Sequence, residues 1–184
     1  MNNLTVLLYI GMHYDRINSK RALMKNFIAT IKTAVIGTID TDNHPFLSYA
    51  PYIYDENRFY IYISNIATHA KNIQANPHCS LFFTQDESQT ENLFARKRIS
   101  LQCFATKIER ESKRFEEVFK LYNEKFDPSM VEMLKKMTDF NLFELEVKSG
   151  EATFGFGEAY TIGGEHMNEL ISRQGSGGGH HGSK

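Results

Sequence analysis

Residues 60–83, YIYISNIATHAKNIQANPHCSLFF, decide how this chain folds. The apolar, β-prone run 59–63 predicts a strand that stops at a serine–asparagine pair. A short helix is then predicted, since proline in the following Asn-Pro pair disfavours helical backbone at the residue before it. The apolar face of that helix consists of Ile66, Ala70 and Ile73 at positions i, i+4 and i+7. A second apolar run, 79–84, predicts another strand, so the stretch reads as strand, helix, strand.

The start of this short helix has two interpretations. The first N–H groups of a helix lack helical partners and the helix dipole is positive there, so a phosphate or carboxylate is stabilised at that end. Ser64, Asn65 and Thr68 add polar donors, and Lys71 adds a positive charge. Alternatively, Ser64 or Asn65 simply caps the helix.

The bulk composition excludes several classes of function. The chain has 184 residues, which suits one domain, and a formal net charge of -1, which gives no electrostatic case for binding nucleic acid or an anionic membrane. The apolar run 4–10 is too short to span a bilayer and lacks the features of a signal peptide. Cys79 and Cys103 fall in predicted strands without a paired spacing, which indicates reduced core residues of a cytoplasmic protein.

The remaining elements follow from periodicity and turn signals, and together they predict a mainly β, α+β fold. Helical patterns cover 16–32, 112–126 with Ser112 at its start, a segment that begins at Asp127-Pro128, and 166–173. Strand patterns cover 33–40, 46–54, 93–108, 138–147 and 151–162. Pro51 makes an unbroken central ladder improbable at its position, so we expect an edge or a bulge there. Short turns between strands predict a small antiparallel barrel of six or seven strands with helices at its periphery.

The domain organisation is simple. Residues 1–15 form an N-terminal extension of unassigned role, 16–173 form the barrel domain, and 174–184 form a glycine- and histidine-rich tail. Such a tail loses too much chain entropy to hold one structure unaided, so it is expected to become ordered only on binding.

Two groups of residues offer chemistry beyond the helix start. Imidazole ligates haem iron and zinc, so His180 or His181 on the flexible tail could reach a bound metal centre, although a solvated tail is the alternative. Arg96 and Arg98 are predicted on one face of a strand, where guanidinium groups bind propionates or phosphates; surface ion pairing is the alternative.

Two single residues are further candidates. His69 lies beside the apolar stripe of the short helix, where a histidine more commonly serves packing. Asp139 precedes a strand, where it either caps a turn or orients a ligand histidine through the other ring nitrogen. The sequence contains no GxGxxG, P-loop, GxSxG or CxxC motif, and its other histidines lack zinc-ligand spacing.

Four segments of the chain resemble a known superfamily. SNIATHAKNIQANPHCSLFF (64–83) resembles the phosphate-binding segment of the pyridoxamine 5′-phosphate oxidase-like, FMN-binding split barrels, and the order of elements matches over 16–162. FARKRISLQCFATKI (94–108), MTDFNLFELEV (137–147) and GEATFGFGEAY (150–160), followed by a histidine-bearing tail, are similar to the haem-utilisation branch of that superfamily.

The resemblance implies a homodimer that binds haem near the dimer interface. It implies that a C-terminal histidine ligates the iron, with His180 as the candidate and His181 as the alternative. It also implies that Arg98, or second Arg96, faces the distal side, that Asp139 supports the proximal histidine, and that His69 is linked to the haem site.

These inferences lead to three hypotheses. The first is haem binding with oxidative ring opening for iron acquisition, using an external electron donor. The second is an FMN-dependent oxidoreductase that holds the FMN phosphate at Ser64, Thr68 and Lys71. The third is a haem carrier or storage protein without catalysis.

Overall fold

The computed structural model describes residues 19–173. The tail 174–184, with His180 and His181, and the extension 1–15 lie outside the described residues, so the division of the chain into these segments stays a prediction. No helix within 19–173 is long and apolar enough to cross a membrane.

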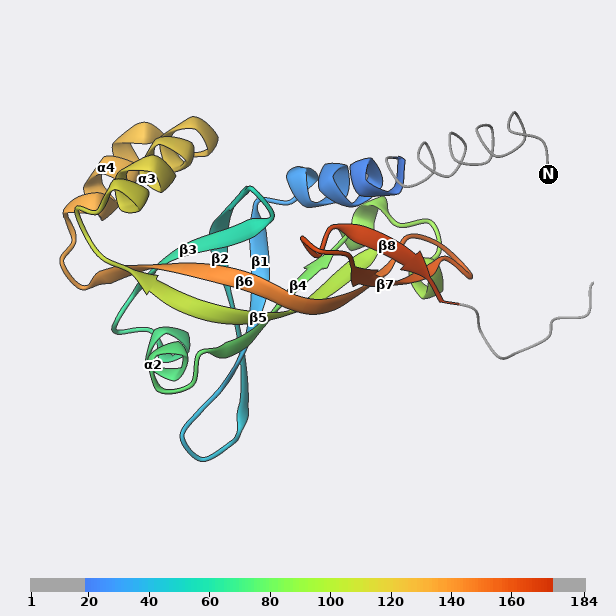
Figure 1. Cartoon of the computed structure of the whole chain (residues 1–184), viewed down its shortest axis with the longest axis horizontal. Coiled ribbons are helices and arrows are strands. Elements are labelled where there is room, and N and C mark those ends of the chain that lie inside the picture. Colours follow the sequence, from blue (N-terminus) through green and yellow to red (C-terminus); the bar gives the residue numbers. More distant parts are fainter. Residues whose placement is uncertain (1–18, 174–184) are drawn as a thin grey trace, which may run out of the picture.

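The described chain forms an antiparallel β-barrel, as the sequence predicts. Its sheet has eight strands in the order β3-β2-β1-β4-β5-β6-β7-β8, and a further pairing of β3 with β6 closes the first six into a barrel. The strands are β1 Thr33–Ile39, β2 Pro45–Asp55, β3 Arg58–Ser64, β4 His78–Thr84, β5 Arg98–Ile108, β6 Phe140–Thr153, β7 Ala159–Gly163 and β8 Glu169–Ser172. β7 and β8 extend the sheet beyond the closed barrel (Figure 1).

The helices lie at the periphery of this barrel (Figure 1). Residues 19–30 are helical and precede β1, and α2 Thr68–Ala75 connects β3 to β4. α3 Lys113–Lys125 and α4 Pro128–Lys136 form a hairpin between β5 and β6. The predicted starts of that hairpin are confirmed, because Ser112 accepts a bond from Phe115 N–H and Asp127 accepts one from Met130 N–H, with proline at the first helical position.

β2 resolves the question that Pro51 raises. Its first half pairs with β1 as far as Pro51, and its second half pairs with β3 from Tyr52 onward. Pro51, which has no N–H to donate, therefore lies where the strand changes partners, and the long strand crosses the corner of the barrel without losing a bond in the middle of a ladder.

The structure corrects three predicted elements. Residues 93–95 form a 3-10 turn, so β5 begins at Arg98 instead of Leu93. β6 runs unbroken through the predicted gap at 148–150, and the glycines instead form the turn to β7, where Gly157 has φ +74°. The predicted helix at 166–173 is a turn followed by β8, because its apolar residues pair with β7.

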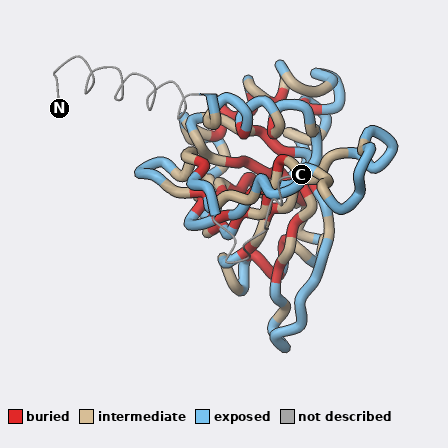
Figure 2. The backbone as a smooth tube through the Cα atoms, turned by 90° about the vertical axis from the view of Figure 1, so that its right-hand side faces the viewer, coloured by how far each residue is buried: buried red, intermediate tan, exposed pale blue. Residues whose placement is uncertain are grey.

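The hydrophobic core fills the barrel, and a second cluster lies between the barrel and the α3–α4 hairpin. Figure 2 shows buried backbone inside the barrel and an exposed β1–β2 hairpin tip at the bottom of the view. The buried Tyr52 ties the helix at 19–30 to this core, since its hydroxyl lies 2.7 Å from Ile28 O and 2.9 Å from Ile31 O.

Candidate functional site

The first group of predicted residues meets where β3 ends and β6 begins. The β3–β6 register pairs Ser64 with Phe140, which brings Asp139 beside Ser64 although 75 residues separate them. Ser64 Oγ donates to Asp139 Oδ2 at 2.6 Å and accepts from Ile66 N–H at 3.2 Å, while Asn65 N–H donates to Asp139 O at 2.8 Å. A serine and an aspartate that the sequence nominates separately are thus one hydrogen-bonded unit.

The helix start differs from the capping interpretation. The N-cap of α2 is Ala67, which makes no side-chain cap, so neither Ser64 nor Asn65 caps the helix. Ile66 precedes the helix and is 79% exposed, so it is not part of the buried face. Asn65 Oδ1 instead accepts from Gln74 Nε2 and Asn141 Nδ2, which fixes the turn between β3 and α2 against β6.

The predicted phosphate cradle is only partly assembled. Thr68 and Lys71 are exposed on α2, but the Ser64 hydroxyl points to the Asp139 carboxylate. A phosphate at Ser64 would face that carboxylate as a like charge. This local chemistry disfavours FMN phosphate at Ser64.

His69 lies on the inner flank of α2 and is half-buried. Its Nδ1 lies 2.8 Å from Ser48 Oγ on β2, and burial lowers the pKa of the imidazole below its usual 6.5. A neutral imidazole is therefore favoured near pH 7, with one ring nitrogen engaged by Ser48. Sequence reasoning did not identify Ser48 as this partner. The only sequence signal for it is a polar residue between Leu47 and Tyr49 in an otherwise apolar strand.

The second group, the arginines, lies around the start of β5, at the end of the barrel opposite Ser64 and Asp139. Only Arg98 is in the strand, so the prediction that Arg96 and Arg98 share one strand face is wrong. Arg96 Nε donates to Gln85 O at 2.6 Å and its Nη1 lies 3.6 Å from Glu87 Oε2; the exposed Arg98 donates from Nη1 to Arg96 O at 3.0 Å. The arginines are nevertheless neighbours, held by the loop between β4 and β5.

A groove of about 780 Å³ opens beside Arg96, one of the two arginines. Its walls come from the helix at 19–30, from β1 and β4, and from the 85–97 loop. Arg96 and Lys97 give it two positive charges against the one negative charge of Asp86, and Phe27, Phe82 and Phe154 give it aromatic surface. This volume lies in the range of small-molecule and cofactor sites. The three aromatic residues escaped sequence reasoning, because nothing in their local patterns separates a groove wall from a core.

The two groups are far apart within one chain. Asp139 immediately precedes β6, whereas Arg98 pairs with Thr153 at the far end of the same 14-residue strand. At about 3.3 Å per residue, β6 spans roughly 40 Å. In Figure 1, α2 and the start of β6 accordingly lie on the left, and the end of β6 lies on the right with β7 and β8.

The described part of the chain ends at the arginine end of the barrel. Arg173, the last described residue, donates its N–H to Ala159 O at 2.9 Å, and Ala159 pairs with Thr153, the partner of Arg98. His180 and His181 thus follow within eight residues of this end of the barrel, although their own positions lie outside the described residues.

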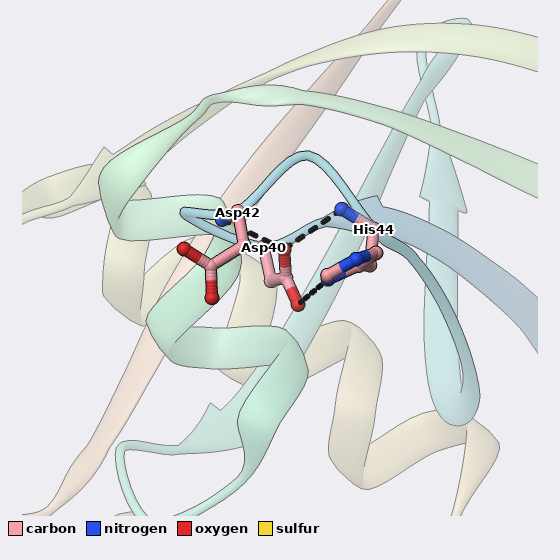
Figure 3. Close-up of side chains that lie close together, drawn as sticks. All are labelled: Asp40, Asp42 and His44. Carbon is pink, nitrogen blue, oxygen red and sulfur yellow. Dashed lines mark hydrogen bonds and ion pairs between the residues drawn. The ribbon is translucent and has the colours of Figure 1, made fainter.

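One cluster in the described chain has metal-ligand spacing, in the β1–β2 turn (Figure 3). Asp40 Oδ1 accepts from the N–H groups of Asp42 and His44 at 2.9 and 2.8 Å, and its Oδ2 lies 3.5 Å from His44 Nδ1. The His44 N–H bond is the first cause that lowers the pKa of Asp40. Asp40 therefore stabilises the tight turn between β1 and β2.

Comparisons with known proteins agree with this architecture. Residues 21–154 match the family described as Pyridoxamine 5′-phosphate oxidase. The chain is 33% identical over 148 residues to the protein named heme oxygenase HutZ from Vibrio cholerae, covering 80% of this chain and 84% of that protein.

Solved structures of related proteins superpose on this chain as well. The crystal structure of HutZ, described as a heme storage protein from V. cholerae, superposes with TM-score 0.66 at 32% identity, covering 70% of this chain and 90% of the other. Campylobacter jejuni ChuZ superposes with TM-score 0.79 at 28% identity, covering 89% of this chain and 65% of the other, so this chain spans less than two thirds of ChuZ. The chain therefore belongs to the pyridoxamine 5′-phosphate oxidase-like split barrels, in their haem-utilisation branch.

Proposed function

We propose that this protein binds haem and degrades it oxidatively for iron acquisition. The observation that carries the proposal is the groove at the arginine end, from which the histidine-bearing tail also departs. The name heme oxygenase of the V. cholerae relative supports the same chemistry.

The residues present fit haem in size and in chemistry. Haem is a flat apolar macrocycle with two carboxylates, and the groove offers aromatic walls together with Arg96 and Lys97. Residues from the described chain that line this groove include no histidine, cysteine or methionine. The axial ligand is therefore assigned to the tail, to His180 with His181 as the alternative. An extended chain reaches at most about 3.6 Å per residue, so His180 has roughly 25 Å of reach from Arg173.

The site is proposed to be shared between two copies of the chain. Asp139 and Arg98 lie at opposite ends of β6, so they serve one haem only if one protomer supplies the arginine end and its partner supplies the α2 end. Exposed apolar side chains on β2 support a homodimer, since Leu47 is 72% and Tyr49 70% exposed.

Each residue has a defined role in this arrangement. With haem bound, Arg96 and Lys97 would attract its carboxylates, and Arg98, which neighbours the groove without lining it, would donate hydrogen bonds to a ligand of the iron. Asp139 would accept the N–H of the ligand histidine through Oδ1, while Ser64 engages its Oδ2. His69, held by Ser48, supplies a neutral imidazole at the α2 end. Haem, when bound, supplies the dioxygen chemistry, and an external donor supplies the electrons.

The test uses the purified full chain and added haem. A sharp Soret band is expected, and it should shift or weaken in the His180→Ala/His181→Ala double variant. With dioxygen and a reductant, the wild type should yield a ring-opened product and free iron. An unchanged spectrum in the double variant would exclude the tail ligand. Stoichiometric binding without product would instead identify a haem carrier or storage protein.

The FMN alternative has a separate test. The FMN-binding character of the superfamily supports it, whereas the Ser64–Asp139 bond opposes it. Bound FMN after purification, lost in a Lys71→Met variant, would favour the oxidoreductase. Cytoplasmic location is also part of the proposal, and it is supported by the two buried, free cysteines.

A further inference from the structure

A second cleft lies on the opposite flank of the helix at 19–30 from the haem groove. The groove is lined by Leu23, Asn26, Phe27 and Thr30, whereas this cleft is lined by Lys25, Ile28 and Ala29 of the same helix. Its floor comes from β2 and its far wall from α3. The volume is about 430 Å³, enough for a small organic molecule.

The floor of the cleft is apolar and partly aromatic. Ile28, Tyr52 and Ile53 are buried beneath it, and Tyr54 and Leu121 complete its lining. The Tyr52 hydroxyl bonds to the carbonyls of Ile28 and Ile31, and the Tyr54 hydroxyl lies 3.1 Å from Asn57 Oδ1. Tyr52 is fully buried and Lys125 Nζ covers its ring, so the half-buried Tyr54 and Leu121 supply the apolar surface for a ligand.

Positive charge gathers at this cleft without neutralisation. Lys125 Nζ donates to Tyr52 O at 2.9 Å and lies 3.9 Å from the centre of the Tyr52 ring. Within residues 19–173 no carboxylate forms an ion pair with Lys125, Lys25 or Lys32, and an ammonium has three donors. Lys25, Lys125 and one carboxylate, the exposed Glu124, line the cleft, and the charge of Lys32 also acts on Lys125, so the net charge there is positive.

The protonation of Lys125 responds to the same surroundings. Burial first, and then the charge of Lys32, lower the pKa of Lys125 from its usual 10.5. The charged groups near it are Glu124 on its own helix, and Lys25 and Lys32 from the helix at 19–30 and the segment that follows it. An anion in the cleft would relieve the repulsion between the lysines, whereas a neutral ligand would not.

We propose that this cleft is a binding site for a small carboxylate with a flat apolar body, distinct from the haem groove. The carboxylate would take the free donors of Lys125, with Lys25 as a second cation, and the apolar body would lie against Tyr54 and Leu121. The alternative role of Lys125 is structural, because it is a basic residue in the last turn of α3 and favours the helix dipole there.

The test measures benzoate binding to the haem-free full chain by ligand-observed saturation-transfer NMR. Benzyl alcohol and inorganic phosphate serve as comparison ligands that keep only the ring or only the anion. Benzoate is expected to bind saturably and at least about tenfold more tightly than either, since both halves of the site contribute.

The variants separate a ligand site from a structural lysine. Lys125→Met should weaken benzoate binding about tenfold, and the exposed Lys25→Met, which leaves the packing intact, by about threefold. Leu121→Trp should fill the cleft and abolish binding. Lys120→Met, also on α3 but outside the cleft, and Arg96→Met in the haem groove should both leave it unchanged. Equal binding of benzyl alcohol, or wild-type affinity in Lys25→Met and Leu121→Trp, would overturn the proposal.

Discussion

The two ends of the barrel hold their polar side chains in different ways. At the α2 end, hydrogen bonds join residues far apart in sequence, such as Ser64 to Asp139 and Asn65 to Asn141, with separations of 75 and 76 residues. At the arginine end, Arg96 and Arg98 bond to carbonyls only 11 and 2 residues away. The first end is fixed by the tertiary structure, whereas the second is fixed only by its own loop and can adjust when a ligand binds.

The sharpest test of this contrast compares one arginine from each end. Arg110, beyond the end of β5 near the α2 side, donates to Lys135 O at 2.6 Å, Met137 O at 2.7 Å and the Tyr62 hydroxyl at 2.9 Å. Arg110→Ala should lower the free energy of unfolding by about 2 kcal/mol, because several partly buried acceptors lose one charged donor. Arg98→Ala should change it by less than about 0.5 kcal/mol. Urea denaturation measures both free energies of unfolding. Similar losses in the two variants would contradict the difference between the two ends of the barrel.

The proposed sharing of the site between two protomers predicts complementation between two inactive variants. Arg98→Ala and Asp139→Ala homodimers should each lose at least about tenfold in haem-degradation rate, since each lacks a group at both sites. A purified heterodimer of the two carries one intact and one doubly damaged site, so it should recover about half of the wild-type rate. Differently tagged chains allow its isolation. A heterodimer as inactive as its parents would show that both residues act within one protomer.

The Ser64–Asp139 bond predicts a smaller effect on stability. Ser64→Ala should cost about 1–2 kcal/mol, because the carboxylate loses a hydroxyl donor at 2.6 Å. Thr68→Ala, exposed on the same segment, is the matched control and should stay within about 0.5 kcal/mol. Thermal unfolding monitored by circular dichroism compares them. If both variants unfold alike, the bond does not fix this end.

His69 predicts the smallest effect, a dependence of stability on pH. Burial lowers its pKa in the folded state, so between that pKa and 6.5 the unfolded chain binds more protons than the folded one. Stability should therefore fall as pH drops below 6.5 and level off below the folded pKa. The contribution is less than about 1 kcal/mol at a half-buried site. His69→Gln should flatten this part of the profile, and an unchanged profile would assign the slope to other groups.

The sequence predicts the barrel well because its signals there are local. The β-prone run 59–63 and the Asn-Pro stop give β3, the end of α2 and β4 almost to the residue, whereas α2 begins at Thr68, later than its pattern predicts; caps at Ser112 and Asp127 give α3 and α4. The predictions fail where distant pairing decides. The apolar residues of 166–173 become a strand only because β7 lies beside them.

The candidate site shows the same difference between features that local sequence signals predict and features that distant pairing decides. Ser64, Asp139 and His69 are visible as residues, but their partners depend on the β3–β6 register and on the approach of α2 to β2, which no local pattern encodes. Arg96 and Arg98 are placed on the wrong element because 93–97 has the composition of a strand. The role of His180 and His181 stays a prediction.

The pairing of β3 with β6 has a consequence for how the chain folds. Every other pairing in the sheet joins strands closer in sequence than these two, whose partners are roughly 80 residues apart, so this pairing carries the largest loop-closure entropy. We expect the barrel to form first as an open, curved sheet that closes last. Pulse-labelled hydrogen exchange should then protect β3 amides that bond to β6 after those of the β4–β5 hairpin. Until that moment the apolar interior faces water, and the unclosed edges are the most vulnerable to aggregation.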